Sequence, residues 1–231
     1  MNPAHDPRRT HTEVLAELVE LDGRVVVDVG CGSGALVRWL HDQAKEAIGV
    51  ECGEIMLALA LEADPQHRGA YRTGVAQALP LPDASADVVI FSQSLHHVPG
   101  DDMLPALAEA HRVLRDGGVL YVVEPEAVGP GHEVIKVIDD ETAVRALAQG
   151  ALDQAPQLGF DPASATEFTS RTVVRDVDAL AERVVGVDPN RAARMEQYRA
   201  EFERRFEQFA TPFGDGFAFD QENIVRVFRK A

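Results

Sequence analysis

The first half of the chain alternates between two hydrophobic patterns. Short runs of β-branched and other apolar residues, as in Val25–Val29, are typical of strands that are buried on both faces. Between these runs, apolar residues recur every three or four positions, which is typical of amphipathic helices. The runs lie at 25–29, 47–50, 71–75, 88–91 and 119–123, and the helical stretches at 12–21, 35–44, 55–63 and 103–114. This alternation predicts an α/β fold, a doubly wound sheet with helices on both faces.

The second half of the chain carries a weaker pattern. Its two last apolar segments, 217–219 and 224–229, look like a hairpin that closes the sheet. With 231 residues, 45% of them hydrophobic, the chain has the size of one large globular domain. We therefore predict a single domain over 1–231, with 24–125 as its core and 126–231 as lid helices and closing strands. The predicted helices of this half lie at 135–158, 177–185 and 190–209, and a further strand at 165–175.

Three glycines follow the first predicted strand. Gly30, Gly32 and Gly34 alternate with small residues and lead into a helix that begins at Ala35. A strand, a tight glycine turn and a helix form a cradle in which a ligand can approach backbone that a Cβ atom would block. Two ligands commonly occupy such a cradle: S-adenosylmethionine, and a dinucleotide such as NAD, whose relaxed Gly-x-Gly-x-x-Ala fingerprint is present here. The glycines alone do not decide between them.

Longer motifs favour S-adenosylmethionine. Asp28 stands two residues before Gly-x-Gly-x-Gly, and residues 79–83 read Leu-Pro-Leu-Pro-Asp shortly before the fourth predicted strand. Residues 95–98 read Leu-His-His-Val, and a helix ending in Val-Leu-Arg-Asp-Gly-Gly precedes the fifth strand. Over residues 24–125 the chain resembles the class I S-adenosylmethionine-dependent methyltransferases. The resemblance implies a Rossmann-like seven-stranded sheet whose last strand is antiparallel to the others, and methyl transfer to an acceptor.

An acidic residue ends the second predicted strand. Glu51 lies 21 residues after Gly30, the spacing at which a carboxylate reaches the ribose hydroxyls in doubly wound nucleotide sites. A carboxylate suits this task because it accepts two O–H hydrogen bonds at once. We therefore expect Glu51 to hold the ribose of the cofactor.

The resemblance implies roles for further residues around the cradle. Asp28 and the glycines would hold the amino-acid part of the cofactor, Ala76 and Gln77 would lie on the adenine side, and Ser92 and Gln93 would line the methionine arm. Val75 stands where the family usually has an Asp that reads the adenine amino group, so we expect that hydrogen bond to be missing. The predicted cofactor-binding set is Asp28, Gly30, Cys31, Gly32, Gly34, Glu51, Cys52, Ala76, Gln77, Ser92 and Gln93.

Candidate catalytic residues follow the fourth and fifth strands. His96 and His97 are the best candidates for a general base, because histidine titrates near neutral pH; alternatively, they shape the loop. Glu124 could bind a cationic acceptor amine or have a structural role beside Pro125. No metal site is predicted: His132-Glu133 does not begin a His-Glu-x-x-His motif, because Lys136 occupies the last position.

Charge and cysteine content narrow the function. A net charge of −16 disfavours nucleic acid and anionic membranes as partners. No apolar run approaches the ~20 residues of a membrane span. The two cysteines, Cys31 and Cys52, are more consistent with free thiols in the cytoplasm than with a disulfide. The sequence indicates no oligomeric state.

The sequence therefore predicts an S-adenosylmethionine-dependent methyltransferase that acts on a small molecule. Two other interpretations stay open at this point. One is a non-catalytic protein that binds the same cofactor and serves a partner. The other is a nicotinamide-dependent oxidoreductase, which is disfavoured because no tyrosine is followed four residues later by lysine, as short-chain dehydrogenases require.

Overall fold

The computed structural model describes residues 8–188 and 190–231. The chain forms two compact units. The first, here the cradle unit, comprises Thr12–Glu124, Ala146–Thr166 and Ile224–Ala231. The second, here the helical unit, comprises the described residues of Pro125–Arg145 and Glu167–Asn223 together with residues 8–11. The predicted boundary between core and lid, near residue 125, coincides with a boundary between these units. The single-domain and lid interpretations stay predictions.

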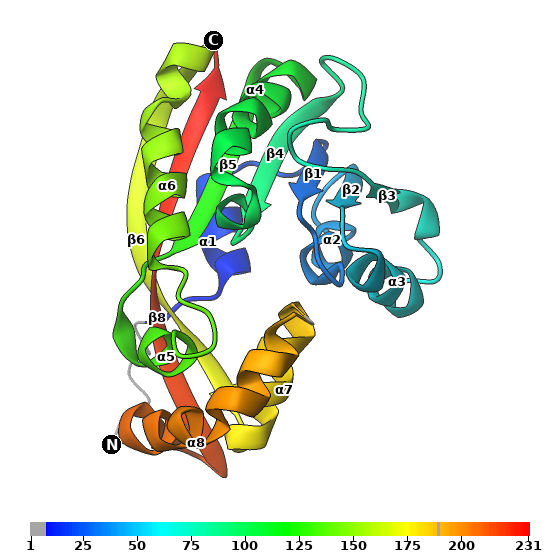
Figure 1. Cartoon of the computed structure of the whole chain (residues 1–231). Coiled ribbons are helices and arrows are strands. Elements are labelled where there is room, and N and C mark those ends of the chain that lie inside the picture. Colours follow the sequence, from blue (N-terminus) through cyan, green and yellow to red (C-terminus); the bar gives the residue numbers. More distant parts are fainter. Residues whose placement is uncertain (1–7, 189) are drawn as a thin grey trace, which may run out of the picture. The chain divides into compact units, whose positions relative to one another are not determined.

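The strands form one mixed, open sheet in the order β3-β2-β1-β4-β5-β8-β6, and the short β7 pairs with β8 (Figure 1). The pairs β1–β2, β2–β3, β1–β4 and β4–β5 are parallel, whereas β7 and β8 are antiparallel. The predicted doubly wound, Rossmann-like sheet is confirmed, with the short β7 added to the seven strands expected. The strands are β1 (Val25–Val29), β2 (Glu46–Glu51), β3 (Tyr71–Thr73), β4 (Ala86–Ser92), β5 (Leu114–Pro125), β6 (Phe160–Val174), β7 (Thr211–Phe213) and β8 (Gly216–Lys230).

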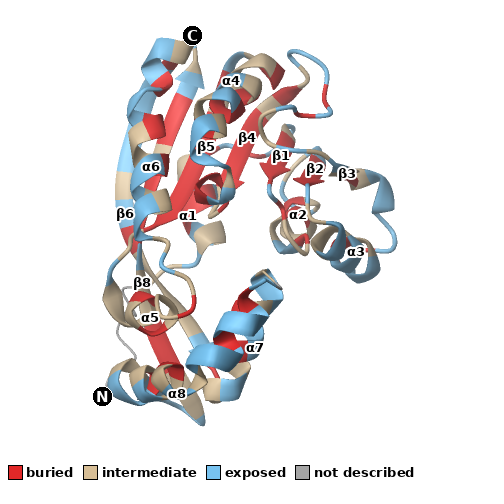
Figure 2. Ribbon diagram, viewed as in Figure 1, coloured by how far each residue is buried: buried red, intermediate tan, exposed pale blue. Residues whose placement is uncertain are grey.

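Helices cover both faces of the sheet in the cradle unit. Alternate strand residues such as Val27 and Phe91 join one buried cluster with α4 and α6. On the opposite face α2 packs so closely over Gly49 that a Cβ atom there would lie 2.9 Å from Val37. The central strands are therefore buried on both sides, as their continuous apolar sequence requires (Figure 2). The helices are α1 (His11–Leu18), α2 (Ala35–Leu40), α3 (Glu54–Ala63), α4 (Met103–Val113), α5 (Gly129–Ile135), α6 (Thr142–Asp153), α7 (Val177–Val187) and α8 (Arg191–Phe209).

The predicted closing hairpin is wrong. Residues 217–219 and 224–229 belong to one continuous strand, β8. The polar segment between them resembles a turn, but its side chains have partners along the sheet. Asp220 pairs with Arg171 at 2.7 Å, and the Asn223 side-chain amide donates to the Ser170 hydroxyl at 3.0 Å. These bonds keep the polar segment extended, although its composition alone would predict a loop.

The helix predicted over 135–158 is also wrong as a single element. It consists of α5, α6 and a short 3-10 turn at Ala155–Leu158. The interruption comes from Asp140, whose Oδ1 accepts from the Thr142 backbone N–H at 3.1 Å and thereby starts α6. Arg191 pairs with Asp139 at 2.8 Å and with Glu141 at 2.7 Å, which fixes the connection in the helical unit. In the described part of the chain, no helix is long and apolar enough to cross a membrane.

Candidate cofactor and catalytic site

The strand order reverses between β1 and β4. From β1 the chain adds β2 and β3 on one side, and then β4 and β5 on the other. In open parallel sheets a crevice forms at such a reversal, beyond the carboxyl ends of the strands. The ends of β1, β2, β4 and β5 carry the glycine turn, Glu51, the loop 92–98 and Glu124, respectively. The fold therefore gathers most of the predicted site residues at one edge of the sheet.

The first and second glycines of the turn have different roles. Gly30 has φ +72°, and a Cβ atom there would lie 2.7 Å from the Cβ of Ser94, so this position needs glycine for packing. The Ser94 hydroxyl donates to the Val29 carbonyl at 2.6 Å and so joins the loop after β4 to the end of β1. Gly32 has φ +55°, and its nearest neighbour in that direction is the terminal methyl of Met56 at 3.7 Å. Gly32 thus leaves room in which a ligand can approach the backbone.

Glu51 organises the turn from the end of β2. Its carboxylate is buried and accepts from the Gly32 N–H at 2.8 Å and from the Gly53 N–H at 2.7 Å. Each carboxylate oxygen has more than one acceptor position, so both can accept a further O–H. The geometry is compatible with the predicted ribose role, and it adds a structural role that the spacing alone does not show.

Asp28 is a buried acid of the site with a side-chain oxygen left unsatisfied by the described part of the chain. Its side chain is 1% exposed, and its Oδ1 has no hydrogen-bond partner within the described residues. Burial, with a smaller contribution from the Glu51 charge, raises the pKa of Asp28 to about 7. An unpartnered buried carboxylate oxygen is unfavourable unless something pairs with it. A cationic or N–H-bearing ligand group would supply that partner, and the ammonium group of an amino acid is such a group.

The two cysteines are both free thiols. Cys31 is buried within the turn, and burial together with the Asp28 and Glu51 charges raises the pKa of its thiol. Cys52 is exposed beside Glu51, and its thiol pKa is also raised, by partial burial and then by the Glu51 charge. Thiols held in the protonated form are poor nucleophiles, so neither residue is suited to covalent catalysis. Their predicted contact with the cofactor stays a prediction.

The segment after β3 carries the predicted adenine side. Val75 is 41% exposed and forms an isolated bridge with Ala78, so it offers an apolar surface and no acceptor side chain. Ala76 packs against the sheet core. The Gln77 side-chain amide donates to Asp102 at 3.1 Å, which uses one of its two N–H groups and leaves its carbonyl oxygen as an acceptor. The roles of Ala76 and Gln77 stay predictions.

The loop after β4 begins with unusual backbone geometry. Gln93 has φ +56°, a left-handed conformation that side-chain-bearing residues adopt rarely, and its N–H donates to the Val123 carbonyl at 2.8 Å. Such conformations occur preferentially at functional sites. Ser92, at the end of β4, is half-buried. The assignment of Ser92 and Gln93 to the methionine arm stays a prediction.

The two histidines of this loop differ in environment. His96 is 4% exposed, and its Nδ1 forms a short hydrogen bond with the Glu124 carboxylate. The other Glu124 oxygen accepts from the Leu95 N–H at 3.0 Å. His97 is exposed and lies against His96 with ring centroids 4.1 Å apart. The two bonds of Glu124 favour the structural alternative over the predicted contact with an acceptor amine.

Sequence reasoning missed the residue that fixes the Leu-Pro-Leu-Pro-Asp segment. Arg112, on α4, donates to the carbonyls of Leu79 at 3.1 Å and Leu81 at 2.9 Å. Its guanidinium also pairs with Glu109 at 2.7 Å and with Asp83 at 2.6 Å. These neighbours raise the already high pKa of Arg112, Glu109 contributing most. Arg112 lies in the helix that precedes the Gly-Gly turn, and nothing in its spacing indicates carbonyl partners 31 and 33 residues away.

Comparison with known proteins assigns the family. A family model described as a methyltransferase domain matches residues 27–122. A probable S-adenosylmethionine-dependent methyltransferase of Mycolicibacterium smegmatis is 37% identical over an alignment of 191 residues that covers 78% of this chain and 73% of that protein. The 27-O-demethylrifamycin SV methyltransferase of Amycolatopsis mediterranei is 31% identical over an alignment of 173 residues that covers 70% of this chain and 63% of that protein.

A solved structure agrees at the level of the fold. The crystal structure of an S-adenosylmethionine-dependent methyltransferase from Mesorhizobium loti has a TM-score of 0.55 with this chain at 20% identity, and the match covers 94% of this chain and 96% of that one. The chain therefore belongs to the S-adenosylmethionine-dependent methyltransferases, and S-adenosylmethionine is its cofactor. The nicotinamide-dependent alternative has no support from these relatives.

The residues present fit that cofactor. The orphaned Asp28 oxygen lacks a cationic partner, the space over Gly32 would be filled by a Cβ atom, and Glu51 can accept hydroxyls. Glu51 itself holds the Gly32 N–H, and Asp28 lies on β1 two residues before the glycine turn begins. The site thus matches an amino acid and a ribose rather than a phosphate, for which a carboxylate pair would be repulsive.

Proposed function

We propose that this methyltransferase acts on a small-molecule acceptor and that a hydroxyl oxygen of that molecule receives the methyl group. Three observations support the proposal. The net charge of −16 disfavours nucleic acid. One relative is named for methylation at an oxygen of a small molecule. The exposed His97 beside the buried His96 is a suitable base for a nucleophile that carries a proton. The cytoplasm is the proposed location.

When bound, S-adenosylmethionine supplies an activated methyl group on a cationic sulfur. The residues of the chain then have mainly to position the reactants and exclude water, which can contribute on the order of 7–11 kcal/mol. Asp28 and the glycine turn would bind the amino-acid part, and Glu51 the ribose. Ala76 and Gln77 would border the adenine, and Ser92 and Gln93 the methionine arm. None of these residues needs to move a proton.

Proton removal from a hydroxyl acceptor falls to the histidine pair. Because a carboxylate only accepts, His96 Nδ1 carries the proton of its bond to Glu124, and this bond fixes the orientation of the ring. His97 lies against that fixed ring at a tilt and is exposed. In this proposal His97 accepts the acceptor's proton, while His96 and Glu124 act as positioning residues that hold the loop.

The direct test is an assay for S-adenosylhomocysteine after incubation with S-adenosylmethionine and matched panels of small hydroxyl, amine and thiol acceptors. The proposal expects turnover within the hydroxyl panel, and loss of most of that turnover in His97→Ala. Turnover confined to amines would contradict the hydroxyl proposal and would favour the prediction that Glu124 binds an acceptor amine. Tight cofactor binding without turnover in any panel would favour the non-catalytic alternative.

A further inference from the structure

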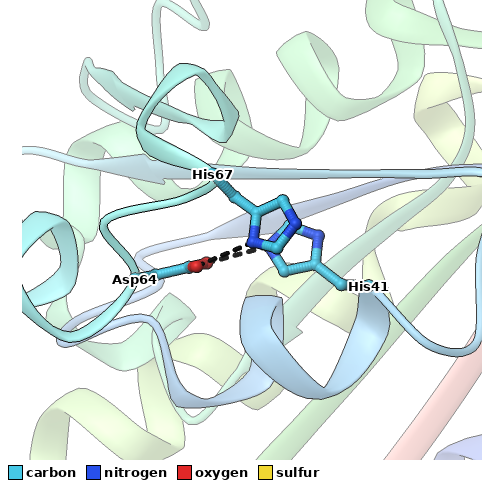
Figure 3. Close-up of side chains that lie close together, drawn as sticks. All are labelled: His41, Asp64 and His67. Carbon is cyan, nitrogen blue, oxygen red and sulfur yellow. Dashed lines mark hydrogen bonds and ion pairs between the residues drawn. The ribbon is translucent and has the colours of Figure 1, made fainter.

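A cluster of two histidines and an aspartate lies outside the residues assigned to methyl transfer. His41 follows α2 directly, Asp64 follows α3, and His67 lies in the turn that leads to β3. Figure 3 shows both imidazole rings directed at the one carboxylate. His41 Nε2 lies 2.9 Å from Asp64 Oδ2, and His67 Nδ1 lies 2.8 Å from Asp64 Oδ1. All three residues belong to the cradle unit.

The chemistry of these side chains is that of a transition-metal site. We propose that His41, Asp64 and His67 bind one divalent first-row transition-metal ion, with Zn²⁺ as the reference ion. Two imidazole nitrogens and one carboxylate oxygen are a common three-ligand set for zinc, with water as the fourth ligand. Magnesium and calcium are disfavoured, because they prefer oxygen ligands.

The geometry requires little rearrangement. One potential ligand atom from each of the three residues lies within 4.8 Å of the others. Around zinc, with bonds of about 2.0–2.1 Å, tetrahedral ligand atoms are roughly 3.4 Å apart. His67 pairs with Asp64 Oδ1 and His41 with Asp64 Oδ2. If the carboxylate binds through both oxygens, these pairs at 2.8 and 2.9 Å have to open by about half an ångström as the metal replaces the shared protons.

The surroundings supply the other requirements of such a site. The Tyr71 hydroxyl donates to Asp64 Oδ2 at 3.0 Å and would orient the ligating carboxylate, as outer-shell partners of metal ligands do. Asp64 is 6% exposed, whereas the His67 side chain is 50% exposed, so the cluster has a buried base and a solvent-exposed entry. The ring centroids of His41 and His67 are already 4.0 Å apart, so metal binding has to order these two side chains only a little further.

A metal ion bound at this cluster would stabilise the glycine turn of the cofactor site. It would join the end of α2 to the connection between α3 and β3. Tyr71, its outer-shell partner, packs beneath the turn, since a Cβ atom at Gly34 would lie 2.7 Å from the Tyr71 hydroxyl. The proposed role is structural. It does not depend on which acceptor the enzyme methylates.

The test measures zinc binding by the whole chain after chelator treatment, by calorimetry and by competition with a chromophoric chelator. We expect one saturable site, a rise in melting temperature with zinc, and a loss of affinity of at least about tenfold in both His67→Gln and His41→Gln. His111→Gln, at a histidine outside the cluster, is the matched control and should bind zinc as the parent chain does. Circular dichroism checks that each variant is folded, and the exposed His67 makes His67→Gln the safest of them.

Cobalt substitution identifies the ligands independently. The proposal expects d–d bands of a four- or five-coordinate nitrogen and oxygen site that disappear in His67→Gln. A thiolate charge-transfer band would assign the metal to Cys31 or Cys52 and overturn the proposal. Absence of saturable zinc binding, or binding unchanged in both His67→Gln and His41→Gln, would also overturn it and leave a hydrogen-bonded cluster only.

Discussion

Glu51 Oε2 accepts a hydrogen bond of 2.8 Å from the backbone N–H of Gly32. This bond joins the end of β2 to the middle of the glycine turn, at the position where the turn leaves room for a ligand. The residue expected to bind the ribose therefore also holds the backbone expected to face the methionine part. Such a site is largely formed before the cofactor arrives, which lowers the ordering cost of binding.

Cofactor affinity should depend on pH through Asp28. Its pKa is raised to about 7, so at pH 6 most of the unliganded protein carries a protonated Asp28. A cationic ligand group near this residue favours the ionised carboxylate. S-adenosylmethionine should therefore bind more tightly as pH rises through about 7, and binding at pH 6 should release a proton. Calorimetry in buffers of different ionisation enthalpy measures this release, which Asp28→Asn should abolish.

The stability of the unliganded protein should change with pH in the opposite direction to its cofactor affinity. Because the native pKa of Asp28 lies above its ordinary value of 3.8, the native state binds more protons than the unfolded state between about pH 4 and pH 7. The contribution of Asp28 to stability is therefore most favourable at low pH and falls as pH rises through this window. Urea titrations should show a smaller decline for Asp28→Asn than for the parent chain. Parallel pH profiles of the two proteins would contradict the assigned pKa shift.

Gly30→Ala should destabilise the cradle unit through two effects. The residue would adopt φ +72°, which costs roughly 1–2 kcal/mol for a residue with a Cβ atom, and that atom would overlap with Ser94. Gly23→Ala is a matched control, because Gly23 has φ +71° with no heavy atom within 4 Å of the added Cβ. Thermal unfolding should show a clearly larger loss for Gly30→Ala. Equal losses of stability in Gly30→Ala and Gly23→Ala would mean that Ser94 moves aside at no cost in free energy.

Arg112→Lys should destabilise the segment that contains Leu79 and Leu81. Lysine keeps the charge but cannot reproduce the planar set of bonds to two carbonyls and two carboxylates. We expect a loss of about 1–2 kcal/mol in the free energy of unfolding. Arg115→Lys is the control, since Arg115 is 43% exposed and pairs with Asp87. Similar losses of unfolding free energy in Arg112→Lys and Arg115→Lys would argue against a special role of the planar set of bonds that Arg112 makes.

His97→Ala should separate catalysis from cofactor binding. Loss of a general base lowers turnover by about 10²–10⁴-fold, while affinity for S-adenosylmethionine should stay within about twofold of the parent value. The pH dependence of turnover should also change, which a purely structural residue would not cause. If cofactor affinity falls sharply instead, His97 belongs to the cofactor site and not to the chemistry.

The cofactor half of the molecule could be predicted from the sequence because its signals are local. The strand Val25–Val29 has the predicted bounds. Glu51 ends β2 as expected from its spacing to Gly30. In this region hydrophobic pattern, turn chemistry and motif spacing all indicate the same structure.

The remaining features depend on contacts between residues distant in sequence. The extended Asp220–Asn223 segment needs Arg171 and Ser170 as partners. The burial of Glu124 can be explained only once its hydrogen bond with His96 is known. Asp64 and His67 have a suggestive spacing of three, but His41 joins them only because α2 and α3 both pack against β2. Periodicity within one segment carries no information on such pairings.

Calorimetric titration of Glu51→Ala with S-adenosylmethionine tests the central claim most directly. Glu54→Ala, an exposed acid on the adjoining helix, is the control, and Glu51→Gln keeps the side-chain size. If Glu51 binds the ribose, its removal weakens cofactor binding by roughly 1.5–3 kcal/mol, the range for a hydrogen bond to a charged group, while Glu54→Ala binds normally. Unchanged affinity in Glu51→Ala would contradict the assignment of the cofactor site.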